Sequence, residues 1–151
     1  MTKSERLQPI VKVSESRERR AAGKLAEAMQ RRQQAEERLK ELQRYRDEYE
    51  QLFQRDAHYG VGAEKLRDYR SFAALLSQGV EHQNRKVKEA AAACEEARRA
   101  WLETRTRCQA LDKAMENHCR AERRSEARRE QRDSDEHAQR IRGEAIADEG
   151  E

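Results

Sequence analysis

A spacing of apolar residues that alternates between three and four runs unbroken through about a third of this chain, and it constrains the fold more than any other feature. Stepping this way from Leu66 reaches His118 in sixteen positions, and thirteen of them are apolar. An apolar residue at every 3.5 positions over seven heptads is typical of a coiled-coil helix. The positions are Leu66, Tyr69, Ala73, Leu76, Val80, Gln83, Val87, Ala90, Cys94, Ala97, Trp101, Thr104, Cys108, Leu111, Met115 and His118.

Two glycines, Gly60 and Gly62, mark the place where the helical pattern must stop. Glycine costs a helix interior about 1 kcal/mol relative to alanine and readily adopts the left-handed conformations that a reversal needs. We therefore expect a hairpin with arm one at 8–56, a turn at 57–63 and arm two at 64–142. Pro9 suits the first turn of arm one, Gly143 is expected to end arm two, and the tail 143–151 is expected to be disordered.

The apolar stripe of the first arm is less regular. One row contains Leu25, Leu39 and Phe53, and Arg32 and Arg46 interrupt it. Alanine and arginine in the seam between two helices predict thin packing toward the N-terminus and heavier packing near the turn. The second row consists of Ala21, Ala28, Ala35, Leu42 and Tyr49.

The composition agrees with a structure that buries only a narrow stripe on each helix. The chain has 151 residues, of which 42% are charged, 35% hydrophobic and 5% aromatic. A compact globule of this length normally carries more apolar side chains. The sequence thus predicts an all-α fold, a long antiparallel two-helix coiled coil that forms a single elongated unit.

The sequence offers no support for catalysis, a cofactor or a metal. It has no glycine-rich phosphate loop, its four histidines lie far apart, and Glu and Asp recur at the spacing of a solvated helix face. No stretch has the length and apolar content of a membrane span. Cys94 and Cys108 would lie about 21 Å apart along one helix, which is too far for a disulfide. We expect a non-enzymatic, cytoplasmic protein with reduced thiols.

The aromatic residues gather near the expected turn. Six of the seven lie within 28 residues, and only Trp101 lies elsewhere. Two explanations remain open: these side chains pack the end of the hairpin, or some of them face outward and form a docking surface for a partner. The six are Tyr45, Tyr49, Phe53, Tyr59, Tyr69 and Phe72.

The order and spacing of several short motifs resemble the flagellar export protein FliJ family over most of the chain. Ser-x-Arg-Leu-x-Pro-Ile at 4–10 is followed by Tyr-Arg-x-Glu-Tyr at 45–49 and Phe53. Arm two contributes Leu66-x-x-Tyr69-x-x-Phe72, Gln83-x-x-x-Val87, Trp101 and Arg-Arg-Glu-Gln at 128–131.

The resemblance implies a component of the flagellar type III export apparatus that is similar to the central stalk of rotary ATPases. The implied partners are the hexameric export ATPase, the cytoplasmic domain of the export gate membrane protein, and export chaperones. The implied location is the inner face of the cell membrane, reached only through these partners. The implied patch for the gate and the chaperones consists of Arg38, Leu42, Tyr45, Tyr49, Phe72, Leu76, Gly79 and Gln83.

Basic residues near the start of arm one and late in arm two are expected to meet at one end of the hairpin, where a stalk would enter a ring. A basic end could instead bind nucleic acid, but no base-stacking aromatics lie near it. A stalk of a virulence type III secretion system and a purely structural coiled coil would show the same helical pattern. The residues expected at the ATPase ring are Arg6, Lys12, Arg17, Arg20, Arg120, Arg124 and Arg128.

Overall fold

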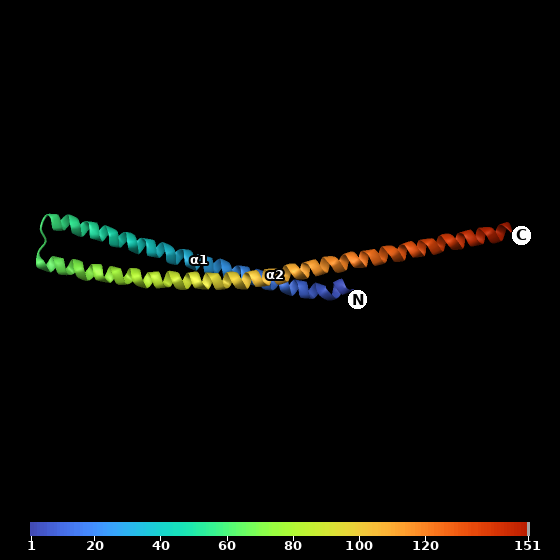
Figure 1. Cartoon of the computed structure of the whole chain (residues 1–151), viewed down its shortest axis with the longest axis horizontal. Helices are drawn as coiled ribbons and strands as arrows, with labels where there is room; N and C mark the ends of the chain where they lie inside the picture. Colours follow the sequence, from blue (N-terminus) through green and yellow to red (C-terminus); the bar gives the residue numbers. More distant parts are fainter. Residues whose placement is uncertain (151) are drawn as a thin grey trace. The chain divides into compact units, whose positions relative to one another are not determined.

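The computed structural model describes residues 1–150, and these residues form two helices and no strand (Figure 1). Helix α1 spans Lys3–His58 and helix α2 spans Ala63–Glu149. Within residues 18–104 the two run side by side in opposite directions, which confirms the all-α helical hairpin.

Packing divides the chain into two units. The hairpin unit is Glu18–Thr104, and the terminal unit is Met1–Arg17 with Arg105–Glu151. The expectation of a single elongated unit stays a prediction.

The turn lies within the residues where the glycines place it. Residues 59–62 separate the helices, and Gly60 adopts a left-handed backbone with φ 88°. The amides of Tyr59 and Gly60 donate to the carbonyls of Asp56 and Ala57, which closes the last turn of α1. Gly60 therefore terminates the helix through its conformation, because residues with a Cβ rarely adopt that backbone.

We expect Gly60→Ala to destabilise the hairpin by about 1 kcal/mol, because alanine is strained at a positive φ. Gly62→Ala is the matched control, since Gly62 has no positive φ and an added Cβ would meet nothing within 4 Å. Urea unfolding followed by circular dichroism measures both variants. Equal stability of the two variants would contradict this role of Gly60.

In the hairpin unit, the 3-4 series of α2 forms the face that packs against α1. Tyr69, Val80, Gln83 and Cys94 are buried, and the remaining members of the series up to Thr104 are half-buried except Ala73, which is exposed. This is the burial expected when one apolar stripe meets a partner helix.

The matching face of α1 contains the two rows expected from the sequence. Leu25, Leu39 and Phe53 are half-buried, as are all five members of the alanine-rich row. Arg32 occupies a seam position but does not pack there. Its side chain is exposed, and its Nε lies 3.1 Å from a Glu36 carboxylate oxygen. Packing is accordingly thin at this level of the hairpin.

Two polar side chains in the seam of the hairpin unit form hydrogen bonds across it. The Gln83 side-chain amide donates to the Ala35 carbonyl at 3.0 Å, and the Trp101 indole N–H donates to Glu18 at 3.0 Å. A polar group between packed helices favours the register in which it finds its partner. These bonds therefore specify how the two helices of this unit align.

In the terminal unit, α1 begins at Lys3 rather than at residue 8 as expected. The reason is a capping box: the Glu5 amide donates to the Thr2 hydroxyl, and the Thr2 amide donates to the Glu5 carboxylate. Such a pair satisfies two amides that a helix N-terminus otherwise leaves unpaired. The Glu122 carboxylate adds to this, since it accepts the Ser4 amide at 3.0 Å and the Ser4 hydroxyl at 2.5 Å.

Helix α2 of the terminal unit continues past the expected end at Gly143 and stops at Glu149. The expectation of a disordered tail is therefore wrong for 143–149, and residue 151 lies outside the described residues. A single glycine weakens a helix by about 1 kcal/mol without ending it, and Gly143 does not have a positive φ. All residues from 123 to 150 are exposed, so this stretch has no packing partner among the described residues.

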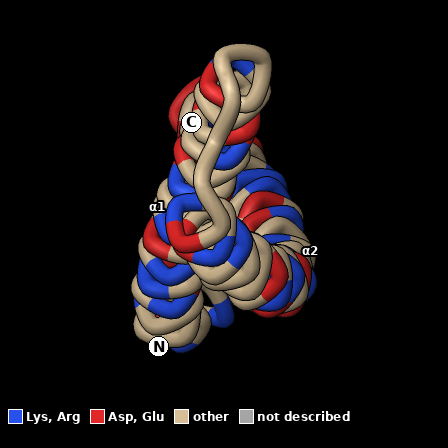
Figure 2. The backbone as a smooth tube through the Cα atoms, turned by 90° about the vertical axis from the view of Figure 1, so that its left-hand side faces the viewer, with Lys and Arg blue, Asp and Glu red and all other residues tan. Residues whose placement is uncertain are grey.

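Charges of both signs alternate along the two helices, whereas residues 59–62 of the turn carry none (Figure 2). Neither described helix is long and apolar enough to cross a bilayer.

Candidate partner-binding surface

The seam of the hairpin unit has two sides, and the heptad pattern assigns residues to each. With the seam residues as positions a and d, the g positions of both helices border one side and the e positions border the other. Arg38 and Tyr45 of α1 and Phe72 and Gly79 of α2 are g positions. All eight residues of the patch that the resemblance implies occupy d or g positions, so they border the same side of the seam.

Four of these patch residues line a single groove. Arg38, Leu42 and Tyr45 of α1 and Leu76 of α2 border a volume of about 540 Å³. Tyr45 is 61% exposed, whereas Leu42 and Leu76 are half-buried. The groove therefore presents an apolar floor with an exposed aromatic side chain and an arginine at its rim. The Arg38 guanidinium lies 3.3 Å from Glu41, and both of these side chains are exposed.

Tyr49 and Phe72 of the patch contact each other across the seam. Their ring centroids lie 4.5 Å apart in an edge-to-face arrangement. Phe72 remains 39% exposed, and Tyr49 is half-buried. Phe72 thus extends the exposed aromatic surface, whereas Tyr49 supports it from beneath.

The last two patch residues contribute little exposed surface. Gly79 is half-buried, and a Cβ added there would meet nothing within 4 Å. Gln83 is buried, and its amide is engaged by the Ala35 carbonyl. A role for these two residues in contact with a partner stays a prediction.

Three further residues line the same groove and were not expected from the sequence: Glu41, Arg44 and Glu48. They follow one another at intervals of three and four residues, and Glu41 and Glu48 lie one helical turn to either side of Tyr45, so this spacing could have identified them. Their charges give the apolar groove a polar rim, which is the usual arrangement at a protein–protein interface.

Both explanations offered for the aromatic residues apply, to different members. Tyr69 packs on Tyr49 at 5.2 Å and on Phe53 at 4.8 Å, so these three rings fill the seam near the turn. Tyr45 and Phe72 face outward. The hydroxyl of Tyr69 donates to the Asp56 carboxylate at 2.5 Å, and this bond, together with burial, raises the pKa of Tyr69 to about 12.

We expect one of the four tyrosines to form its phenolate only at about pH 12, and Asp56→Asn to lower that pKa. Because the pKa is raised in the folded chain, the bond stabilises the fold below the unfolded tyrosine pKa of about 10 and is lost as pH rises through the folded value. Phenolate absorbance during an alkaline titration measures this. Identical titration curves for parent and variant would rule out the bond.

All seven residues expected at the ATPase ring are exposed. Six belong to the terminal unit, and Arg20 belongs to the hairpin unit. Arg120 forms a 2.5 Å ion pair with Glu116 of the preceding helical turn. The six in the terminal unit are Arg6, Lys12, Arg17, Arg120, Arg124 and Arg128.

The described residues contain no group of three or more His, Cys, Asp or Glu side chains that could hold a metal ion. Cys94, Cys108 and Cys119 are free thiols. That the chain lacks catalytic activity stays a prediction.

Fold and surface together define a class of protein: an antiparallel two-helix coiled coil with exposed aromatic side chains beside its seam. The model of the flagellar FliJ protein family matches residues 2–144. A Flagellar FliJ protein of Salmonella typhi is 30% identical over 108 residues, which is 72% of this chain and 74% of that protein. The chain belongs to the FliJ family of flagellar, export-related proteins. No solved structure matches it.

Proposed function

We propose that this chain is the stalk of the flagellar type III export apparatus, which links the hexameric export ATPase to the export gate and escorts export chaperones. The observation that carries the proposal is the groove bordered by Leu42, Tyr45 and Leu76 on a two-helix coiled coil of this family. A helical hairpin that buries only its seam leaves long faces free for several partners.

The patch is the surface we assign to the cytoplasmic domain of the gate and to chaperones. Exposed tyrosine and phenylalanine beside half-buried leucines combine a large apolar area with a hydrogen-bonding hydroxyl. Such side chains are enriched among the residues that dominate binding energy at interfaces. Tyr45 and Phe72 supply the exposed rings, and Leu42 and Leu76 supply the floor.

The terminal unit is the part we assign to the ATPase ring. Its N-terminal segment, 1–17, carries Lys3, Arg6, Lys12 and Arg17 against Glu5 and Glu15. Exposed cations on a helix can pair with carboxylates of a ring bore, and such pairs weaken as salt increases. In this proposal the chain acts at the inner face of the cell membrane and is held there only through its partners.

Size-exclusion chromatography of the chain with the hexameric flagellar export ATPase and the cytoplasmic domain of the gate tests the proposal. We expect one ternary complex at low salt and loss of the ATPase, but not of the gate domain, at about 1 M salt, where the screening length falls to about 3 Å. Separate elution of all three proteins at low salt would contradict the proposal.

A further inference from the structure

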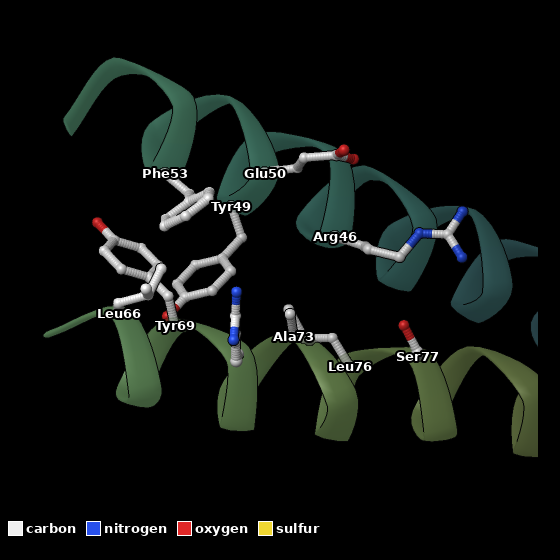
Figure 3. A pocket seen from close by; sticks show the side chains of 10 residues that line it. Arg46, Tyr49, Glu50, Phe53, Leu66, Tyr69, Ala73, Leu76 and Ser77 are labelled. Carbon is white, nitrogen blue, oxygen red and sulfur yellow. The ribbon is translucent and has the colours of Figure 1, made fainter. Parts of the chain in front are cut away.

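A second groove lies on the other side of the seam in the hairpin unit (Figure 3). It has a volume of about 390 Å³, and both helices line it. Apolar and aromatic side chains form most of its surface, and Figure 3 shows Tyr49 and Phe53 of α1 pointing toward α2 at one end of it. We call it the aromatic groove; its apolar lining is Tyr49, Phe53, Leu66, Tyr69, Ala73 and Leu76.

The aromatic groove exists because two seam positions cannot fill it. Arg46 occupies an a position of α1, but its charged end must reach water, so its stem follows the surface. Ala73 is the exposed member of the α2 series and is too small to replace the missing side chain. The gap therefore lies beside the ring cluster of Tyr49, Phe53 and Tyr69.

Charge at the rim of the groove is unbalanced. Arg46 and Arg70 line it, and Glu50 is the one acidic residue in its lining. Among the described residues, the Arg46 guanidinium forms an ion pair only with Asp47, at the long distance of 4.0 Å. Arg70 forms no ion pair within 4.0 Å among these residues. Two guanidinium groups beside an apolar surface fit a ligand that carries both carboxylates and an apolar side chain.

We propose that the aromatic groove binds an amphipathic helix of a partner protein, with an apolar side chain seated between Phe53, Ala73 and Leu76 and acidic residues one helical turn away against Arg46 and Arg70. A third helix can lie along the space between two packed helices and place anchors at three- and four-residue intervals. The charge complementarity of the two arginines specifies an acidic helix rather than a basic one.

This site differs from the patch described above. Glu50, Arg70 and Ser77 are e positions, whereas Arg38, Tyr45 and Gly79 are g positions on the other side of the seam. Tyr49 and Leu76 reach both sides. A helix in the aromatic groove therefore leaves Tyr45 accessible.

Fluorescence anisotropy with three synthetic helical peptides tests the proposal on the full chain. The peptides share one Leu/Phe anchor pattern and carry Glu, Gln or Lys at the flanking positions. We expect the Glu peptide to bind at least about tenfold more tightly than the Lys peptide, and Arg70→Glu to remove that preference. Tyr45→Ala, on the other side of the seam, should leave binding of the Glu peptide unchanged.

Ala73→Leu provides an independent variant, because it fills the groove without altering charge. We expect it to weaken binding of all three peptides at least about tenfold while helix content stays the same. Equal affinity for the Glu and Lys peptides, or binding that survives both Arg70→Glu and Ala73→Leu, would overturn the proposal. The proposal would also be overturned if the parent chain self-associates and Ala73→Leu abolishes that self-association, because a second copy of the chain would then occupy the groove. Because these peptides require neither ATPase nor gate, the result is independent of the stalk function.

Discussion

Tyr45→Ala is expected to weaken binding of the gate's cytoplasmic domain about 30-fold, which corresponds to about 2 kcal/mol, while leaving the melting of the chain unchanged. Tyr45 is 61% exposed, so its removal should change stability by no more than about 0.5 kcal/mol. At an interface, the same ring would be covered by the partner and would contribute as a dominant contact. Isothermal titration calorimetry and circular dichroism measure the two quantities on the same preparation.

Tyr59→Ala is the matched control for this variant. Tyr59 is an even more exposed tyrosine, at 84%, and lies in the turn outside the patch. Its variant should bind the gate domain as the parent chain does. If Tyr45→Ala also binds like the parent, or if both variants lose affinity equally, the patch is not the docking surface.

A charge introduced into the seam of the hairpin unit should be far more costly than one introduced on its outer face. Val80 is 4% exposed and belongs to the seam, so Val80→Asp places a carboxylate at a buried apolar position. We expect a loss of about 3 kcal/mol or more, because a buried charge without a partner carries its full desolvation penalty.

Leu75→Asp introduces the same side chain five residues earlier, at a position that is 64% exposed. Its effect should stay within about 0.5 kcal/mol. Thermal melting followed by circular dichroism compares the two variants. Similar melting temperatures would mean that Val80 does not belong to the seam and that the register of α2 is wrong.

The register of α2 could be predicted from the sequence because apolar residues hold a 3-4 spacing for seven heptads without a skip. Burial follows that series closely, and Ala73 is its one exposed member up to Thr104. The same logic located Gly60, since a glycine between two helical patterns is the residue best able to adopt the left-handed backbone of a turn. Periodicity is reliable here because the seam is the only place where an apolar side chain can leave water.

The polar partners in the seam could not be predicted in the same way. Glu18 looks like one more charged residue of a solvated face until Trp101 of the other helix is placed beside it. Their pairing depends on the alignment of two segments far apart in sequence, and a single sequence does not specify this alignment. The start of α1 was predictable in principle, because Thr2 and Glu5 have the spacing of a capping box.

The patch was predicted as a set of residues, but not how much each is exposed. Heptad positions show that Tyr45 and Gln83 border the same side of the seam, yet Tyr45 is exposed and Gln83 is buried. Gln83 occupies a d position in the seam and is held there by its hydrogen bond to Ala35, whereas Tyr45 occupies a g position beside the seam. The aromatic groove was not predicted from the sequence. It forms because the Ala73 side chain is small and the Arg46 side chain turns toward water, and an unfilled space of this kind leaves no pattern in the sequence.

Stimulation of the hexameric flagellar export ATPase by the purified chain tests the stalk function most directly. The parent chain should raise the rate of ATP hydrolysis, and so should Tyr45→Ala, because Tyr45 belongs to the gate patch. Deleting residues 1–14, or ending the chain after Asn117 and so removing Arg120, Arg124 and Arg128, should abolish the increase while the hairpin unit stays helical. Full stimulation by both shortened chains, or none by the parent, would contradict the proposed function.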